Sequence, residues 1–142
     1  MKKAVLDTNV LVSAFLSDGG IPNQVLRQAG ITYQLFISHD ILEEVERVLC
    51  RPRIQRRVQL LGDEIRVFLA AIQGVADVVE NPTPLRVIED DPDDDLILGC
   101  AVGAKADYLV SGDAHLRKLG GYAGIQIVSP SEFLEVLQEW NR

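Results

Sequence analysis

The stretch that decides the fold is Val5-Leu6-Asp7-Thr8-Asn9, in which a short apolar run ends in a carboxylate, a hydroxyl and an amide. Such a run predicts a buried first strand over residues 3–7, with Asp7 at its carboxyl end. Binding sites in open α/β sheets are built at that end of the strands. A strand followed by an acid is also common at ordinary turns and helix caps. The role of Asp7 therefore depends on whether other acids reach the same place.

Strand and helix signals alternate along the rest of the chain. Further strands are predicted at residues 33–38, 108–111 and 125–128, with a short strand or extended run at 75–80. Helices are predicted at residues 9–16, 22–30, 39–50, 53–61, 63–74, 96–105, 115–119 and 130–140. The alternation predicts an α/β protein, a three-layer α/β/α sandwich with a central parallel sheet. A length of 142 residues with 47% hydrophobic residues predicts one domain over residues 1–142.

The charge and cysteine content narrow the class of protein. A formal net charge of −7 argues against a general nucleic-acid coat protein, but an acidic metal site brings its own cations, so a nucleic-acid enzyme is not excluded. Cys50 and Cys100 form no close pair and are expected to be buried, reduced thiols. The sequence has neither a signal-peptide core nor an apolar run near the roughly 20 residues of a membrane helix. We therefore expect a cytoplasmic protein.

Acidic residues recur where the predicted elements begin or end. Asp7 and Asp113 each follow a strand, and Asp94 stands near the start of the helix over residues 96–105. In the helix over residues 39–50, a wheel at 100° per residue places Glu44 beside the apolar stripe and Glu43 away from it. Glu44 is thus the acid expected to face the sheet edge, where a parallel sheet would also bring the other three.

Carboxylates gathered around one hollow repel each other unless a cation lies between them. Ligation by oxygen alone suits Mg²⁺ or Mn²⁺. Zinc is disfavoured because the cysteines and histidines show no ligand spacing. An EF-hand counted from Asp91 fails, since Leu96 and Val102 occupy the positions that need Gly and Glu. His39 and His115 are interpreted as a helix-start residue and a surface residue.

Arginines concentrate in the middle of this acidic chain, at Arg47, Arg51, Arg53, Arg56, Arg57 and Arg66. One interpretation is a solvated helical arm whose charges are paired. The other is a flank that contacts phosphates, with Arg51, Arg53, Arg56 and Arg57 as the RNA contacts. The sequence leaves both open.

Four segments, in this order, resemble the motifs of PIN-domain ribonucleases. They are Val5-Leu6-Asp7-Thr8-Asn9-Val10-Leu11, Ser38-x-x-Ile41-Leu42-x-Glu44-Val45, Asp91-Pro92-Asp93-Asp94-Asp95-Leu96-Ile97-Leu98 and Ala106-Asp107-Tyr108-Leu109-Val110-Ser111-Gly112-Asp113. The resemblance covers nearly the whole chain. It is strongest to the group described as toxin components of toxin–antitoxin systems.

This resemblance implies a Mg²⁺- or Mn²⁺-dependent endoribonuclease that cleaves single-stranded RNA. The metal-binding acids would be Asp7, Glu44, Asp94 and Asp113. Asn9 and Ser111 match positions that support those ligands through hydrogen bonds. Asp91 and Asp95 stay open as further ligands, because a run of acids permits a slip of one position. An antitoxin would be a separate chain.

Competing hypotheses keep the fold but change the function. One is a non-catalytic α/β module that senses metal or phosphate, or that binds RNA. Receiver-like domains, for example, carry a lysine at a late strand end, where this chain has Gly112-Asp113. Another is a nuclease that acts on DNA, since no reader of the 2′-hydroxyl is identifiable. The arginines and apolar residues of residues 53–74 are compatible with either a homodimer or a monomer. Thr8 is expected to cap the helix that follows it.

Overall fold

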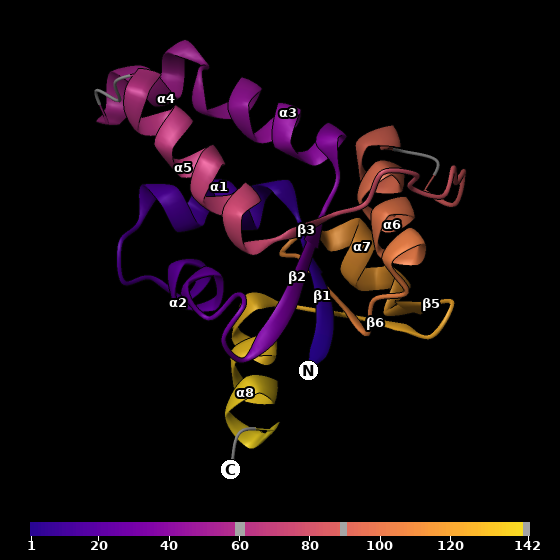
Figure 1. The fold of residues 1–142 in the computed structure, drawn as a ribbon. Helices are drawn as coiled ribbons and strands as arrows, with labels where there is room; N and C mark the ends of the chain where they lie inside the picture. The colour runs from indigo at the N-terminus through magenta and orange to yellow at the C-terminus, as the bar shows by residue number, and fades with distance from the viewer. Residues whose placement is uncertain (59–61, 89–90, 141–142) are drawn as a thin grey trace.

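A computed structural model describes residues 1–58, 62–88 and 91–140 and shows a six-stranded sheet with helices packed around it (Figure 1). The strands are β1 (Lys2–Leu6), β2 (Tyr33–Ile37), β3 (Asp77–Val78), β4 (Tyr108–Val110), β5 (Gly121–Tyr122) and β6 (Ile125–Val128). Their order in the sheet is β3-β2-β1-β4-β6-β5, and every pairing except that of β5 with β6 is parallel. The predicted α/β/α fold class is confirmed.

The helices follow the predicted order. They are α1 (Thr8–Leu16), α2 (Ile21–Arg27), α3 (His39–Leu49), α4 (Pro52–Val58), α5 (Gly62–Val75), α6 (Pro92–Ala104), α7 (Ala114–Leu119) and α8 (Pro130–Trp140). The end predicted for the helix over residues 53–61 lies partly outside the described residues. Within the described part of the chain, no helix is long and apolar enough to cross a membrane.

The two faces of the sheet are covered by different helices (Figure 1). Ala4 is in register with Leu35 and Tyr108, so these side chains share one face. Phe133 of α8 packs there, with ring centroids 5.0 Å from Tyr33 and 5.5 Å from Tyr108. Figure 1 shows α1 and α2 on one side of the sheet and α6 and α7 on the other, which gives three layers.

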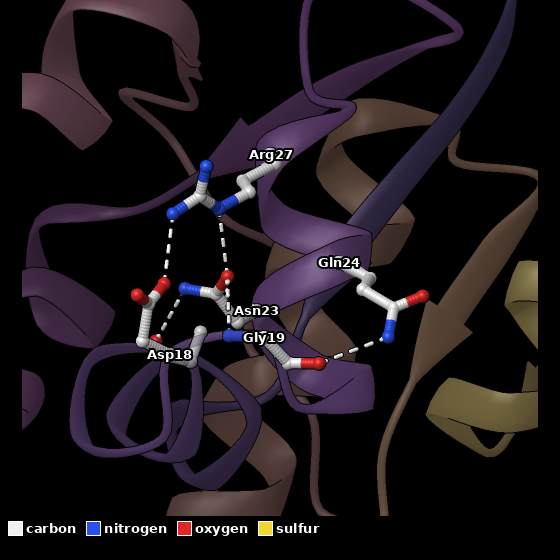
Figure 2. A network of polar contacts seen from close by, with 6 residues as sticks. Asp18, Gly19, Asn23, Gln24 and Arg27 are labelled. Carbon is white, nitrogen blue, oxygen red and sulfur yellow. Dashed lines mark hydrogen bonds and ion pairs between the residues drawn. The ribbon is translucent and has the colours of Figure 1, made fainter.

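A turn fixed by side chains joins α1 to α2 (Figure 2). Asn23 donates through Nδ2 to the Ala14 carbonyl at 2.8 Å, and its Oδ1 accepts from the Arg27 Nε at 2.7 Å. Arg27 also donates to Asp18 Oδ1 at 2.8 Å, and Gln24 donates to the Gly19 carbonyl at 3.0 Å. These contacts hold α2 against the end of α1, the helix that follows Asp7.

Two local predictions prove wrong. Thr8 does not cap α1, because Asp7 holds the N-cap position and Thr8 is the first helical residue. Cys50 is exposed, since it lies at the C-cap of α3, whereas Cys100 is buried as expected. In the sheet, β5 runs antiparallel to β6, because the chain turns back between them at Ala123 (φ 52°) and Gly124 (φ 84°).

Two glycines of α6 pack against the loop that follows β3. A Cβ on Gly99 would overlap the carbonyl oxygen of Thr83, whose backbone N–H donates to the Gly99 carbonyl at 3.0 Å. A Cβ on Gly103 would lie 3.3 Å from the Asn81 carbonyl oxygen. The extended segment after β3 therefore lies directly on α6 and fixes the position of that helix.

The order of the strands creates a switch point beside β1. The chain passes from β1 to β2 on one side, and β4 pairs with β1 on the other. Adjacent parallel strands that lead to connections on opposite sides leave a crevice at their carboxyl ends. The Asp7 backbone N–H donates to the Val110 carbonyl at 2.9 Å, so β1 and β4 end side by side at this crevice.

Candidate metal centre

Asp7 stands at the carboxyl end of β1 and is only 3% exposed. Its Oδ2 accepts a 2.6 Å hydrogen bond from the Ser111 hydroxyl. Burial raises the pKa of the Asp7 carboxyl, the Ser111 hydrogen bond lowers it, and the nearby Asp113 carboxylate raises it. Asp7 is thus a buried acid that is oriented from the neighbouring strand.

Ser111 and Asp113 follow β4 and are joined to each other. The Asp113 backbone N–H donates to the Ser111 Oγ at 2.9 Å, so the same hydroxyl serves both Asp7 and Asp113. The Asp113 Oδ1 accepts from the backbone N–H groups of His115 at 2.8 Å and Leu116 at 3.2 Å. The Asp113 side chain is therefore fixed by the first turn of α7.

Asp94 lies in the first turn of α6 and is 5% exposed. Its Oδ2 is buried and has no hydrogen-bond partner among the described residues. Burial, and then the negative charge of Asp113, raise the pKa of Asp94 to about 7. Asp91 and Asp7 act in the same direction. A buried carboxylate oxygen without a partner carries an energetic penalty that a bound cation would remove.

Glu44 approaches the same place from α3. The stripe predicted beside it is buried, with Ile41, Val45 and Val48 all at most 9% exposed. Burial raises the pKa of Glu44, and the charges of Asp93 and Asp7 raise it further. Thr8 lowers this pKa although its buried hydroxyl has no hydrogen bond within 3.5 Å. Thr8 therefore lies near Glu44 without a hydrogen bond to it.

The fold thus brings together the acids that the sequence singled out. Asp7 and Asp94 each feel the charge of Asp113, and Glu44 feels that of Asp7. The donors are all carboxylate oxygens, and the Asp94 Oδ2 has no hydrogen-bond partner among the described residues. Each of the three raised pKa values reflects burial first and neighbouring carboxylates second. These features fit a hard divalent cation such as Mg²⁺ or Mn²⁺. The individual assignment of Asp7, Glu44, Asp94 and Asp113 as ligands stays a prediction.

Sequence reasoning missed one residue at this centre. His115, interpreted as a surface residue, offers an imidazole nitrogen in a group with oxygens of Asp94 and Asp113, and the three ligand atoms lie within 4.8 Å of one another. Its position two residues after Asp113 was the only available signal. The proximity to Asp94 depends on the start of α7 lying near the first turn of α6.

Other acids and the amide near the motifs have different contacts. The Asn9 side chain is exposed, and it is the Asn9 backbone N–H that lowers the pKa of Asp7. Asp91 caps α6 by accepting from the Asp93 backbone N–H at 3.0 Å. The Oδ1 of Asp95 accepts from the backbone N–H groups of Val87 and Ile88, both at 3.0 Å. Asp95 therefore anchors the segment before α6.

A cavity of about 700 Å³ lies beside the first turn of α6, and Asp94 is not among its lining residues. It is lined by residues 82–86 and 88 of the loop before α6, by Asp40 of α3, and by Pro92, Asp95 and Leu96 of α6. This cavity is mostly apolar, and we place the chemistry at the acids, where the charges converge.

The six central arginines lie in α3, α4 and α5, except for Arg51, which lies between α3 and α4. Arg47 is close enough to Glu44 to lower the pKa of that carboxyl, and Arg66 forms an ion pair with Asp63. The three predicted RNA contacts with described side chains are exposed, namely Arg51, Arg53 and Arg56. The side chain of Arg57 lies outside the described residues. One arginine is thus paired, as the first interpretation expected, and three are available to a ligand.

The fold and the centre define an α/β protein with an acidic site at the switch point of a mostly parallel sheet. A model of the PIN-domain family matches residues 3–115, and the chain belongs to this family. PIN domains are generally metal-dependent nucleases. The resemblance noted from the motifs is therefore confirmed.

Similar proteins cover nearly all of the chain. An uncharacterized protein from Methanocaldococcus jannaschii is 28% identical over 97% of this chain and 93% of its own length. VapBC2 from Rickettsia felis, in a crystal structure bound to a DNA fragment from its promoter, has a TM-score of 0.59 at 13% identity, over 88% of this chain and 96% of that one. FitAcB from Neisseria gonorrhoeae has a TM-score of 0.52 at 16% identity, over 90% of this chain and 98% of that one. Both structures share the fold.

Proposed function

We propose that the chain is a Mg²⁺- or Mn²⁺-dependent endoribonuclease that cleaves single-stranded RNA as the toxin of a toxin–antitoxin module. The observation that carries the proposal is the buried Asp94 Oδ2, which has no hydrogen-bond partner among the described residues and belongs to a side chain near the charges of Asp113 and Asp7. Membership of the PIN-domain family supports the nuclease activity. The four-motif resemblance supports the choice of RNA.

In the proposed site, four acids bind the cation and a serine orients two of these acids. Asp7, Glu44, Asp94 and Asp113 would hold the ion. When bound, it supplies charge neutralisation for the phosphodiester, activation of the attacking water and stabilisation of the departing oxygen. Ser111 orients Asp7 and Asp113 at once through its two hydrogen bonds. Preorganised ligands of this kind need little rearrangement during the reaction.

An arginine path leads away from the acids along α3. Arg47 lies one turn beyond Glu44 on the same side of the helix, and Arg51 follows the end of that helix. Arg53 and Arg56 continue onto α4, with Arg57 as the remaining predicted contact. Guanidinium groups bind phosphate oxygens strongly. We propose that this path guides the RNA backbone toward the acids and offsets the charge of −7.

The partner and setting follow from the same proposal. A separate antitoxin chain is proposed from the resemblance to toxin components and from the fold shared with VapBC2 and FitAcB. A single domain over residues 1–142 is proposed because one buried cluster draws side chains from Ala4 to Leu137. We further propose a cytoplasmic protein, with a homodimer as the expected assembly.

Asp7→Asn tests the proposal, with Asp18→Asn as a matched control. Asp18 is 86% exposed and lies in the turn between α1 and α2, so its loss should cost less than about 1 kcal/mol of stability. With Mn²⁺ and an unstructured RNA, we expect Asp18→Asn to cleave like the wild type and Asp7→Asn to lose at least about a hundredfold in rate. Undiminished cleavage by Asp7→Asn refutes the site. RNA binding without turnover by the wild type favours the non-catalytic module.

A further inference from the structure

We propose that His115 supplies an imidazole ligand to the acid site, which makes the site selective for a first-row transition ion over Mg²⁺. This inference rests on the proposed function, since it deepens the identity of the bound cation. It departs from the all-oxygen site expected from the sequence. It also gives His115 a role that its interpretation as a surface residue did not.

The geometry places the imidazole among the acids. One nitrogen of His115 and single oxygens of Asp94 and Asp113 lie within 4.8 Å of one another. The His115 Nδ1 is 3.9 Å from the Asp113 Oδ1. That separation is too long for a hydrogen bond but leaves space for an ion between them after small side-chain rotations. The His115 side chain is 56% exposed, so it has room to turn toward the site.

A second, independent observation points to a ligand at the same spot. The Asp94 side chain is buried, with the residue 5% exposed, and its Oδ2 has no hydrogen-bond partner among the described residues. The backbone of His115 is itself fixed, because its N–H donates to Asp113 Oδ1 at 2.8 Å. The imidazole is thus attached to a backbone position held by a hydrogen bond, and one of its nitrogens lies within 4.8 Å of an oxygen of the buried Asp94.

The kinds of ligand atom at the site determine which cation binds more tightly. Mg²⁺ is a hard ion that prefers oxygen ligands and retains its waters. Imidazole nitrogen suits transition ions, whose affinities exceed that of Mg²⁺ at mixed nitrogen and oxygen sites. A site with oxygens from Asp94 and Asp113 and a nitrogen from His115 therefore gains selectivity that carboxylates alone lack.

The test compares His115→Gln with His39→Gln, the substitution of the other histidine in the chain. His39 is a matched control because it is exposed at the start of α3 and lies 3.4 Å from Glu80, outside the metal group. Calorimetry measures the Kd for Mn²⁺ and for Mg²⁺, and pulsed electron paramagnetic resonance of bound Mn²⁺ detects a directly coordinated ¹⁴N.

We expect a ¹⁴N coupling in the wild type and in His39→Gln, and none in His115→Gln. The Mn²⁺ affinity of His115→Gln should fall at least about tenfold, the loss typical even for outer partners of metal ligands. Its Mg²⁺ affinity should stay within about threefold of the wild type. Unchanged Mn²⁺ affinity and coupling in His115→Gln overturn this inference alone, provided that Asp94→Asn abolishes binding. Failure of the wild type to bind either ion overturns the proposed function as well.

Discussion

Replacing Ser111 with alanine should weaken both stability and metal binding, because a single hydroxyl supports two acids. Ser111 is fully buried, donates to Asp7 Oδ2 at 2.6 Å and accepts from the Asp113 backbone N–H at 2.9 Å. A buried group left unsatisfied costs roughly 1–3 kcal/mol, so we expect a loss of about 2 kcal/mol in the free energy of unfolding. For a chain of this size that corresponds to a fall in Tm of about 6 °C. Loss of a partner that orients a ligand should also weaken Mn²⁺ binding by about 10–100-fold.

Ser38→Ala separates this positioning role from a merely structural one. Ser38 is also buried, but its hydroxyl caps α3 by accepting from the Ile41 backbone N–H at 3.3 Å. Its loss should cost about 1 kcal/mol and leave Mn²⁺ affinity unchanged. Thermal unfolding and calorimetry on both variants supply the comparison. If Ser111→Ala binds Mn²⁺ within about twofold of the wild type, Ser111 does not position the acids.

Three further predictions concern Asp94, the α6 packing and the arginine path. The pKa of Asp94 in the metal-free fold, about 7, exceeds its ordinary value, so the folded state binds the extra proton. The stability in chelator should therefore fall as pH rises from 5 to 8, and Asp94→Asn should flatten urea midpoints across that range. Gly99→Ala should destabilise by about 1–3 kcal/mol through overlap with a backbone carbonyl, whereas Gly74→Ala, with open space in α5, should be stabilising by about 0.5–1 kcal/mol in the same thermal assay. Arg51→Ala and Arg56→Ala should each weaken RNA binding and lower the slope of log K against log salt by about 0.7 in fluorescence titrations.

Each of these has a clear contrary result. An equally steep pH slope in Asp94→Asn would assign the proton to another group. A stable Gly99→Ala protein would mean that the Thr83 segment does not lie on α6 as described. An unchanged salt slope in both arginine variants would leave the arginines as a solvated arm.

The sequence identified those acids whose position follows from the strand or helix that carries them. Asp7 and Asp113 follow apolar strands, so the sheet alone brings them to one edge. Asp94 depended on the phase of α6, which Asp91 sets by capping the helix and Pro92 supports in the first turn. With the helix started in this way, Asp94 is buried, and Asp95 accepts hydrogen bonds from the loop before α6.

Features that depend on contacts between distant segments escaped prediction. The role of Gly99 required knowing that the segment after β3 crosses α6. The place of His115 required knowing that the start of α7 lies near the first turn of α6. The β5 strand has only two residues, Gly121 and Tyr122, and pairs because a turn returns the chain along β6. Periodicity carries no information about any of these.

The most direct test of the central claim is to map cleaved ends on total cellular RNA treated with wild type and with Asp7→Asn, each with Mn²⁺ and with chelator. The account predicts discrete new ends that appear only with wild-type protein and Mn²⁺. The same ends from Asp7→Asn, or from the wild type in chelator, would contradict a ribonuclease whose chemistry depends on a cation held at Asp7.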